Sequence, residues 1–586
     1  MNMKRMWMTL LALFCALALT ACAANAPQTG AQDAAETPRR LAVEKSAAPD
    51  RSMEDDESLY DYDPLDVVCF YVTVTGGNAA DGTDHTLDEV NSYLNLQGME
   101  NVEKIYTQVL LQAGDEEGPL SGELGYSALA ANATMNVRGR TSTGYPQKSY
   151  RFTLYDNAGF WRGQRAIALN KHPADLTRLR NMLYFQLLRD VPSIPSLRTQ
   201  FVRLYVKDLT AEPPAETFVD YGLYTQVELP NNRYLRNHGL SIDGNLYKAQ
   251  MCEMYRYPDK LKLATDPDYD PAAFATVLEP KTGEDHTKLL QMLDAVNDYG
   301  TPIEDVVERY FDLDNLTSYM AFNLLMGNED SNAQNYLLYS PVNSQKWYYL
   351  CWDGDGCLHY GEDDLMENNF EVSPWTRGVS DYWGVVLFNR LLRTEAFRAA
   401  LSEKMELLRG IITPERVGEM VESYREVVDP FTRRLPDSVN MRVTTARREA
   451  ILPTLAEDVE RGYQYYLESL EKPMPFFLGE VWTEDGALQL SWDAAYDFGG
   501  EFVRYDVQLS SDWRFEDVLW EKKGILETRA SCAIPEAPGE YFWRVTAVNE
   551  SGQTQLAFDS IVTATGAHHG MRHFILQADG GVVNPE

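Results

Sequence analysis

This sequence of 586 residues lacks several patterns that would assign a function directly. It contains no C-x-x-C and no H-E-x-x-H, so it offers neither of these zinc-binding patterns. Five cysteines follow Cys22, and an odd number excludes a complete disulfide framework. Beyond residue 19, no apolar run reaches the roughly 18 residues that a spanning helix needs. Positive charge is also scarce: the formal net charge is −36, so we expect no nucleic-acid partner.

The N-terminus has the composition of a targeting segment. Lys4 and Arg5 precede an apolar stretch over residues 7–19, and Leu19-Thr20-Ala21-Cys22 matches a bacterial lipobox. We therefore expect a lipoprotein signal peptide over residues 1–21 and lipidation of Cys22. The expected localisation is extracytoplasmic, with the protein anchored to the bacterial cell membrane by its lipid. An ordinary signal peptide that happens to contain a cysteine is the alternative.

Length and composition predict more than one globular domain. A single core rarely extends over 586 residues, and a content of 44% hydrophobic residues is typical of packed domains. Residues 22–63 are rich in Ala, Pro, Asp and Glu, which predicts a disordered tether. Strand patterns begin near residue 65 and helical patterns dominate after residue 289. Together they predict an α+β domain over residues 64–471.

The C-terminal part has a different pattern. Residues 487–492, 503–509 and 541–549 alternate apolar and polar side chains, as half-buried strands do. They predict an all-β sandwich over residues 474–566, followed by a tail over residues 567–586. The strand Tyr541-x-Trp543-x-Val545-x-Ala547 resembles one in fibronectin type III modules. Such a module would bind a polymer or protein ligand, or act as a spacer.

The most informative stretch covers residues 327–356. It carries Asp330, then Asn335, and after two short predicted strands Asp353 and Asp355. A hairpin of those strands would bring the two acidic positions to one end. Protein kinases arrange a catalytic base and two Mg²⁺ ligands in the same order. However, no Gly-rich loop, HRD or DFG accompanies the stretch, and a calcium-stabilised or merely solvated loop is the alternative.

Basic residues gather upstream of that stretch. Ten Lys and Arg residues lie between Arg138 and Arg189, against only Asp156 and Asp175. This block suggests a site for phosphate or another anion, and a solvated face with scattered salt bridges is the alternative. Lys148, where a polar loop enters a strand, is a candidate phosphate ligand, although the segment is not a Walker A motif.

A further predicted strand, residues 221–228, ends in Glu228. Its alternating pattern would allow Glu228 to lie beside Lys148, as the paired Lys and Glu of protein kinases do. An ordinary glutamate on an edge strand is the alternative.

Six elements in this order resemble the CotH kinase family, named after spore-coat protein H. The motifs are R-G…K-S-Y, D-x-T-x-x-R-N, G-x-Y-x-x-x-E, Y-K, D-x-x-x-x-N and W-D-x-D, at residues 138–154, 175–181, 222–228, 247–248, 330–335 and 352–355. The resemblance implies a two-lobed, atypical kinase-like fold. It also implies transfer of the γ-phosphate of ATP with Mg²⁺ or Mn²⁺ as cofactor.

The resemblance also implies roles for individual residues. Asp330 would be the catalytic residue, and the metal would be held by Asn335, Asp353 and Asp355. The ATP-binding residues would be Lys148, Glu228 and Arg138, with Glu228 supporting Lys148.

The expected function is therefore that of a lipid-anchored kinase acting on Ser or Thr of surface or secreted, coat-type proteins. Gln147 departs from the family pattern, and Gly354 and Gly356 would loosen the W-D-x-D turn, which predicts weak activity. The alternatives are a non-catalytic pseudokinase or surface scaffold, and a calcium-dependent binding module. Cys351 and Cys357 bracket the turn; a disulfide between them is one prediction, and buried free thiols are the favoured one.

Overall fold

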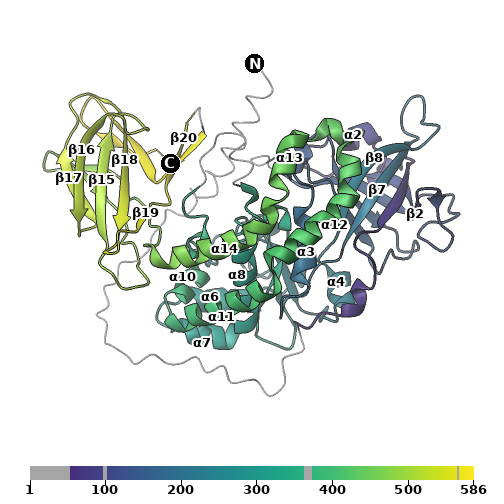
Figure 1. Cartoon of the computed structure of the whole chain (residues 1–586), viewed down its shortest axis with the longest axis horizontal. Coiled ribbons are helices and arrows are strands. Elements are labelled where there is room, and N and C mark those ends of the chain that lie inside the picture. The colour runs from purple at the N-terminus through teal and green to yellow at the C-terminus, as the bar shows by residue number, and fades with distance from the viewer. Residues whose placement is uncertain (1–52, 97–101, 362–372, 564–565, 586) are drawn as a thin grey trace.

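A computed structural model describes residues 53–96, 102–361, 373–563 and 566–585. The predicted fold class is confirmed: a mixed α+β part is followed by an all-β part. In Figure 1 the C-terminal strands lie at one end of the molecule, the first sheet lies at the other, and most of the helices lie between them. The predicted signal peptide, Cys22 and residues 22–52 of the predicted tether lie outside the described residues.

The first sheet closes into a ring. The strand order is β1-β7-β8-β6-β5-β4-β2-β3, and β1 also pairs with β2, which joins the two ends. Only β1 and β7 run parallel among the neighbouring pairs. Alternate side chains, including Phe70, Phe152 and Val202, form a hydrophobic core of their own. The strands are β1 (Val67–Val74), β2 (Thr107–Asp115), β3 (Gly118–Pro119), β4 (Ala133–Arg138), β5 (Ser149–Leu154), β6 (Ala166–Asn170), β7 (Thr199–Asp208) and β8 (Val219–Glu228).

Residues 53–63 correct the predicted extent of the tether. Met53 and Tyr60 are buried, and the Tyr62 hydroxyl donates to the carbonyl of Thr199 at 2.9 Å. Asp55 accepts a hydrogen bond from the Tyr60 hydroxyl at 2.6 Å. The acidic composition of this segment suggested disorder, but its aromatic side chains bury enough surface to order it.

The second part of the α+β region is mainly helical and shares one large core. A four-stranded sheet lies within it, in the order β10 (Leu278–Thr282), β9 (Asn245–Ala249), β11 (Tyr336–Ser340) and β12 (Tyr348–Cys351). The α-helices among the described residues are α2 (Leu87–Ser92), α3 (Arg180–Leu188), α4 (Asn232–Asn237), α5 (Pro271–Ala275), α6 (Thr287–Asn297), α7 (Ile303–Tyr310), α8 (Leu313–Leu325), α10 (Val386–Leu392), α11 (Glu395–Ile411), α12 (Pro414–Thr432), α13 (Thr445–Ile451) and α14 (Thr454–Glu471). Among the described residues, no helix is both long and apolar enough to cross a membrane.

The C-terminal strands form two main sheets around a separate core that includes Trp543. One sheet has β13 (Trp482–Glu484), β14 (Ala487–Ser491) and β17 (Arg529–Ala533). The other has β16 (Val518–Ile525), β15 (Arg504–Ser510), β18 (Gly539–Val548), β22 (Met571–Leu576) and β23 (Val582–Val583), and β18 also pairs with β19 (Thr554–Leu556). A small pair consists of β20 (Ser560–Thr563) and β21 (Gly566–His569).

The predicted boundary of the sandwich at residue 566 is wrong. Strand β22 pairs with β18 in the middle of the larger sheet, and its Phe574 is fully buried. The predicted tail over residues 567–586 therefore contains part of the sandwich. The structure also places Cys351 and Cys357 as buried free thiols, as favoured from the sequence.

Candidate active site

The predicted hairpin brings the two acidic positions of residues 327–356 together. Helix α8 ends before Gly327, whose φ of 51° turns the chain, and the ring of His359 lies where a Cβ would project. The chain then passes through Asp330 and enters β11, which pairs with β12 so that Tyr336 lies opposite Cys351. Asn335 and Trp352 therefore flank the same end of the hairpin.

Asp330 is a buried carboxylate that is held by two amides. Asn335 Nδ2 donates to Asp330 Oδ2 at 2.6 Å, and the Gln334 amide donates to the other oxygen. Burial raises the pKa of Asp330 to about 7, with Asp353 and Asp355 adding to the shift and the two amides opposing it. A carboxylate with this pKa can accept a proton from a hydroxyl at neutral pH.

Asp353 begins a tight turn directly after the hairpin. Its φ of 59° and ψ of 65° place it in the left-handed region, and a short 3₁₀ turn over Gly354–Gly356 follows. Burial and the neighbouring Asp355 raise the pKa of Asp353 to about 6, against the opposing effects of Lys248, Arg138 and His172. His172 Nδ1 lies 3.3 Å from Asp355 Oδ2.

The turn is not loosened by its glycines, contrary to our prediction. A Cβ on Gly354 would overlap the ring of Tyr184, which is fully buried in α3. Gly354 therefore packs tightly against that ring, and the packing fixes the backbone that carries Asp353 and Asp355.

Two cations flank the indole of Trp352 next to these carboxylates. The Arg138 guanidinium, at the end of β4, is 6.0 Å from the ring centroid, and Lys248 Nζ, on β9, is 5.4 Å away. Burial lowers the pKa of Lys248, and Asp353 acts in the opposite direction. Lys248 belongs to the Y-K motif at residues 247–248, but it is not one of the site residues predicted from the sequence. Its position became evident only from the pairing of Lys248 with Leu337 on β11.

The expected pair of Lys148 and Glu228 does not form. Lys148 Nζ donates to the carbonyl of Thr143 at 2.5 Å. Glu228 is buried and accepts from Arg198 Nη2 at 2.6 Å and from His238 Nε2 at 3.0 Å. Arg198, His238 and Asn237 occupy the carboxylate oxygens of Glu228. Glu228 therefore stabilises the fold at the end of β8 and does not orient a nucleotide-binding lysine. Arg138 is thus the predicted ATP-binding residue that the structure brings next to Asp353, while the role of Lys148 stays a prediction.

Part of the upstream basic block forms internal ion pairs. Arg180 pairs with Asp175 at 2.9 Å, Lys171 pairs with Asp437 at 2.7 Å, and Arg165 pairs with Asp156. Helix α3 begins at Arg180, after a turn in which Asp175 accepts hydrogen bonds from the backbone N–H groups of Thr177 and Arg180. Arg178, within that turn, has no carboxylate partner among the described ion pairs.

The Glu228 cluster predicts a pH-dependent stability. Burial alone would lower the pKa of His238, but hydrogen bonds to Asp55 and Glu228 raise it from 6.5 to about 9. The charged ring therefore stabilises the fold fully below pH 6.5, and this contribution is lost as the pH rises through 9. We expect the free energy of unfolding to fall by about 3 kcal/mol across that window, measured by urea denaturation at a series of pH values.

The substitution His238→Gln should remove that slope. A matched control is His573→Gln on β22, since His573 lies outside this cluster and pairs with Glu540. Retention of the full slope in His238→Gln would contradict the assignment to His238.

The donors at the hairpin end suit a hard divalent cation. Within the described ranges, no group of three or more His, Cys, Asp and Glu side chains is arranged to hold a metal ion by itself. Mg²⁺, however, commonly uses one or two carboxylates and completes its shell with water and phosphate oxygens. The charges of Asp353 and Asp355 help to raise the pKa of Asp330, so a cation held among these carboxylates would relieve the repulsion. Asn335 uses its amide nitrogen for Asp330, which leaves the oxygen as the atom that it offers to a metal.

The loop of Asp330 is held from the segment that precedes α10. Asn332 Nδ2 donates to the Asp381 carboxylate at 2.9 Å, and Ser331 Oγ lies 3.0 Å from the Tyr382 hydroxyl. Burial, together with Glu329 and Asp330, raises the pKa of Asp381 well above its ordinary range. No sequence pattern indicates this contact, because about fifty residues separate its two sides.

The same segment carries the contact with the sandwich. Trp383 stacks on Tyr496 with ring centroids 5.5 Å apart, and the Arg393 guanidinium lies 4.5 Å from the Tyr496 centroid. Trp375 packs edge-on against Phe558 at 5.7 Å. The sandwich therefore contacts the segment whose Asp381 and Tyr382 hold the Asp330 loop.

Comparisons with known proteins agree with the order of these motifs. Residues 135–466 match a family model described as CotH kinase protein. No curated protein sequence matches the chain. Among solved structures, the chain is similar to the crystal structure of a Helicobacter pylori proinflammatory kinase, CtkA, with 9% identity and a TM-score of 0.24. That match covers 55% of this chain and 94% of the other. A likeness at this score carries no weight here.

Proposed function

Since the chain belongs to the CotH kinase family, as its motifs predicted, we propose that it is an active atypical protein kinase. It transfers the γ-phosphate of ATP, with Mg²⁺ or Mn²⁺, to Ser or Thr hydroxyls of a protein. The observation that supports this most is the buried Asp330 carboxylate, whose pKa is raised to about 7 in part by the charge of Asp353, which itself lies near Arg138 and Lys248.

Each of these side chains has a role in the proposed reaction. The acceptor hydroxyl gives its proton to Asp330 while its oxygen bonds to the γ-phosphorus, and the bond from that phosphorus to the β–γ bridging oxygen breaks to release ADP. Arg138 and Lys248 offset negative charge on the phosphates. Asn335, Asp353 and Asp355 would hold the divalent metal, which would neutralise charge on the β- and γ-phosphates.

The proposed setting is the outer face of a bacterial membrane. A lipid on Cys22 would anchor the protein there, and the acceptors would be secreted or surface proteins of the coat type. The motif at residues 19–22 supports this setting.

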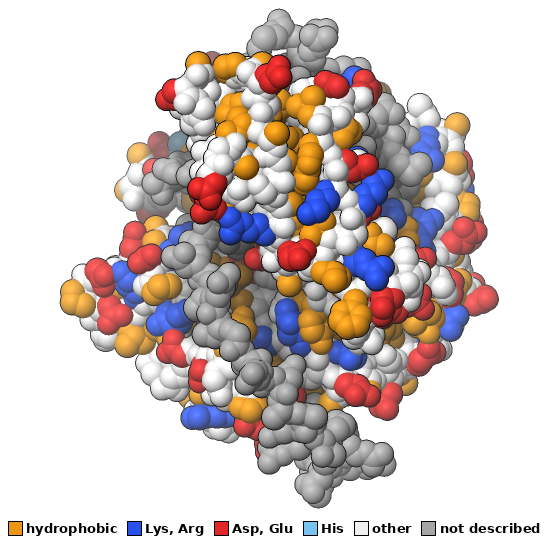
Figure 2. Space-filling view, turned by 90° about the vertical axis from the view of Figure 1, so that its left-hand side faces the viewer, with side chains coloured by type: hydrophobic (Ala, Val, Ile, Leu, Met, Phe, Trp, Pro, Cys, Tyr) orange, Lys and Arg blue, Asp and Glu red, His pale blue; other side chains and the backbone are white. Residues whose placement is uncertain are grey.

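A second candidate function is a surface scaffold that binds through its sandwich. Figure 2 looks onto the face that carries the sandwich and shows apolar side chains among Lys and Arg side chains. Exposed apolar residues of the sandwich include Val518, Leu519, Leu526 and Ile575. An exposed apolar surface of this kind is typical of a binding site for a polymer or a protein. Such binding is compatible with a scaffold and with a kinase.

A nucleotide titration tests the proposal. ATP should bind the purified protein only with Mg²⁺ or Mn²⁺ present, and γ-phosphate should be incorporated into protein. Asp353→Ala should weaken metal-dependent binding at least about tenfold, because it removes a charged ligand. Binding of nucleotide without any phosphate transfer would favour the scaffold, and equal binding by Asp353→Ala would overturn the metal site.

The contact between Trp383 and the sandwich should affect turnover. Trp383→Ala removes the stack on Tyr496 and frees the segment that holds Asn332 and Ser331. We expect kcat to fall roughly tenfold with little change in nucleotide affinity, because only the position of the Asp330 loop changes. Steady-state kinetics with separate kcat and KM would measure this.

Trp513→Ala is the matched control for that experiment. Trp513 stacks on His568 inside the sandwich, with centroids 3.7 Å apart. It should leave kcat unchanged. A fall in kcat of the same size in both variants would indicate a general loss of stability.

A further inference from the structure

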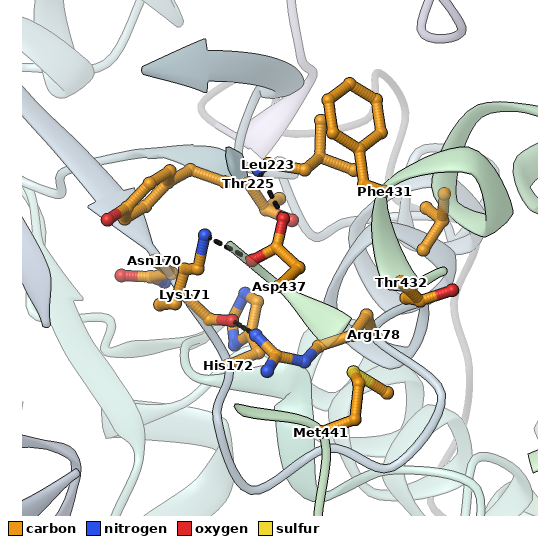
Figure 3. A pocket seen from close by; sticks show the side chains of 12 residues that line it. Asn170, Lys171, His172, Arg178, Leu223, Thr225, Phe431, Thr432, Asp437 and Met441 are labelled. Carbon is orange, nitrogen blue, oxygen red and sulfur yellow. Dashed lines mark hydrogen bonds and ion pairs between the residues drawn. The ribbon is translucent and has the colours of Figure 1, made fainter. Parts of the chain in front are cut away.

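A pocket behind the Asp355 turn is built from cationic side chains. It lies between the end of β6, strand β8 and the C-terminal end of α12. Figure 3 shows Lys171, Asp437 and Arg178 converging there, with Thr432 and Met441 at its other side. Lys171 is only 1% exposed and is neutralised by Asp437, whose carboxylate lies 2.7 Å from its Nζ. Arg178 adds a second positive charge beside this pair, and it interacts electrostatically with Asp437 and Asp175 without an ion pair of its own among those described.

Arg178 has one edge of its guanidinium without a protein acceptor. Its Nη1 donates to the carbonyl of Lys171, whereas Nε and Nη2 are buried and have no hydrogen-bond partner. These two nitrogens form the side-on fork with which arginine binds two oxygens of a carboxylate or phosphate. Leaving such donors unpaired is costly, so the arrangement favours a ligand that supplies the acceptors.

His172 adds a second unpartnered group. It is 6% exposed, and its Nδ1 faces Asp355 while its Nε2 is buried without a partner. Both His172 and Arg178 have left-handed backbones, with φ of 47° and 65°, which non-glycine residues adopt at a cost.

We propose that this pocket binds a phosphate group, held by the Arg178 fork. The two unpartnered nitrogens of the fork take two phosphate oxygens, and His172 Nε2 lines the same pocket. The ligand is either inorganic phosphate or the phosphate of a phosphorylated side chain, which share this chemistry. Because His172 lines the pocket and faces Asp355, occupancy of the pocket is communicated to the turn that carries Asp353.

Entry requires a small movement. Met441 lies beside the guanidinium in Figure 3 and is only partly buried. A methionine side chain is unbranched and adapts readily, so its rotation opens the shortest route to the fork.

The site is tested with the full chain in the absence of nucleotide and divalent metal, so the result does not depend on kinase activity. Inorganic phosphate should bind saturably at one site in a calorimetric titration, with sodium chloride at equal ionic strength as the reference. Arg178→Lys keeps the charge but removes the fork, and should weaken phosphate binding at least about tenfold. Arg434→Gln, an exposed arginine near the pocket, should change it less than about twofold.

Further measurements distinguish this pocket from the nucleotide site and free phosphate from a phosphorylated protein. Arg138→Gln should retain phosphate binding; its loss in that variant would assign the phosphate to the nucleotide site and overturn the proposal. Tighter binding of a phosphoserine peptide than of inorganic phosphate identifies the source as a phosphorylated protein, and binding of inorganic phosphate alone identifies the free ion. If Arg178→Lys fails to fold, a saturable rise in the Tm of the unmodified protein with phosphate, absent with chloride, still supports the site. Absence of both binding and the Tm rise overturns it.

Discussion

Asp330→Asn should abolish phosphate transfer while leaving ATP binding nearly intact. The amide retains the shape of the carboxylate and can still hydrogen-bond to Asn335, but it cannot accept the proton of the acceptor hydroxyl. We expect the rate of γ-phosphate incorporation to fall by about 10³-fold or more, with metal-dependent ATP affinity changed only a few-fold. Single-turnover incorporation and a parallel binding titration would measure the two quantities.

A suitable control for this prediction is Asp305→Asn on α7. Asp305 is exposed and is not among the groups that shift the pKa of Asp330 or of Asp353, so its loss removes one negative charge without touching the site. Incorporation by Asp330→Asn at the rate of the unmodified protein would show that Asp330 is not the catalytic residue. Equal loss of ATP binding and of turnover would instead make Asp330 primarily a ligand for the metal.

Gly354→Ala should disable the site by steric means. The added methyl group would overlap the ring of Tyr184, which is buried between α3 and α8 and cannot move aside without opening the core. The turn must then shift, and Asp353 and Asp355 shift with it. We expect metal-dependent ATP affinity and turnover to fall about 100-fold, together with a loss of roughly 1–3 kcal/mol in the free energy of unfolding.

The neighbouring glycine provides the matched comparison. A Cβ on Gly356 would lie 3.4 Å from Asn328 Oδ1 and 3.6 Å from Asp330 Cβ, which are ordinary contacts. Gly356→Ala should therefore keep ATP affinity within a few-fold of the unmodified protein. Similar behaviour of both alanine variants would mean that flexibility, and not the Tyr184 contact, governs the turn.

The local part of the site was predictable because its members are close in the sequence. Residues 330–355 contain one hairpin, and two short apolar runs separated by a turn were enough to predict that Asn335 and Asp353 lie at the same end of it. The end of α8 at Gly327 was also predictable, since glycine commonly follows a helix.

Contacts between distant segments were not predictable from patterns. The partner of Glu228 proved to be Arg198 and not Lys148, because β7 and not the loop of Lys148 lies beside the end of β8. The structural role of Gly354 depends on its contact with Tyr184, which is 170 residues away in the chain. A glycine in a turn suggests mobility when only the sequence is known, whereas here it marks a close approach of an aromatic ring.

The ring formed by β1 to β8 constrains how a protein acceptor can be recognised. Because β1 pairs with both β7 and β2, this sheet offers no long open edge to which an extended peptide could add as a further strand. Main-chain hydrogen bonding, which is compatible with almost any peptide sequence, therefore cannot recruit a peptide to this sheet. An acceptor segment that docks on this sheet must instead be selected through its side chains, so its recognition there should depend strongly on the residues that flank the modified hydroxyl.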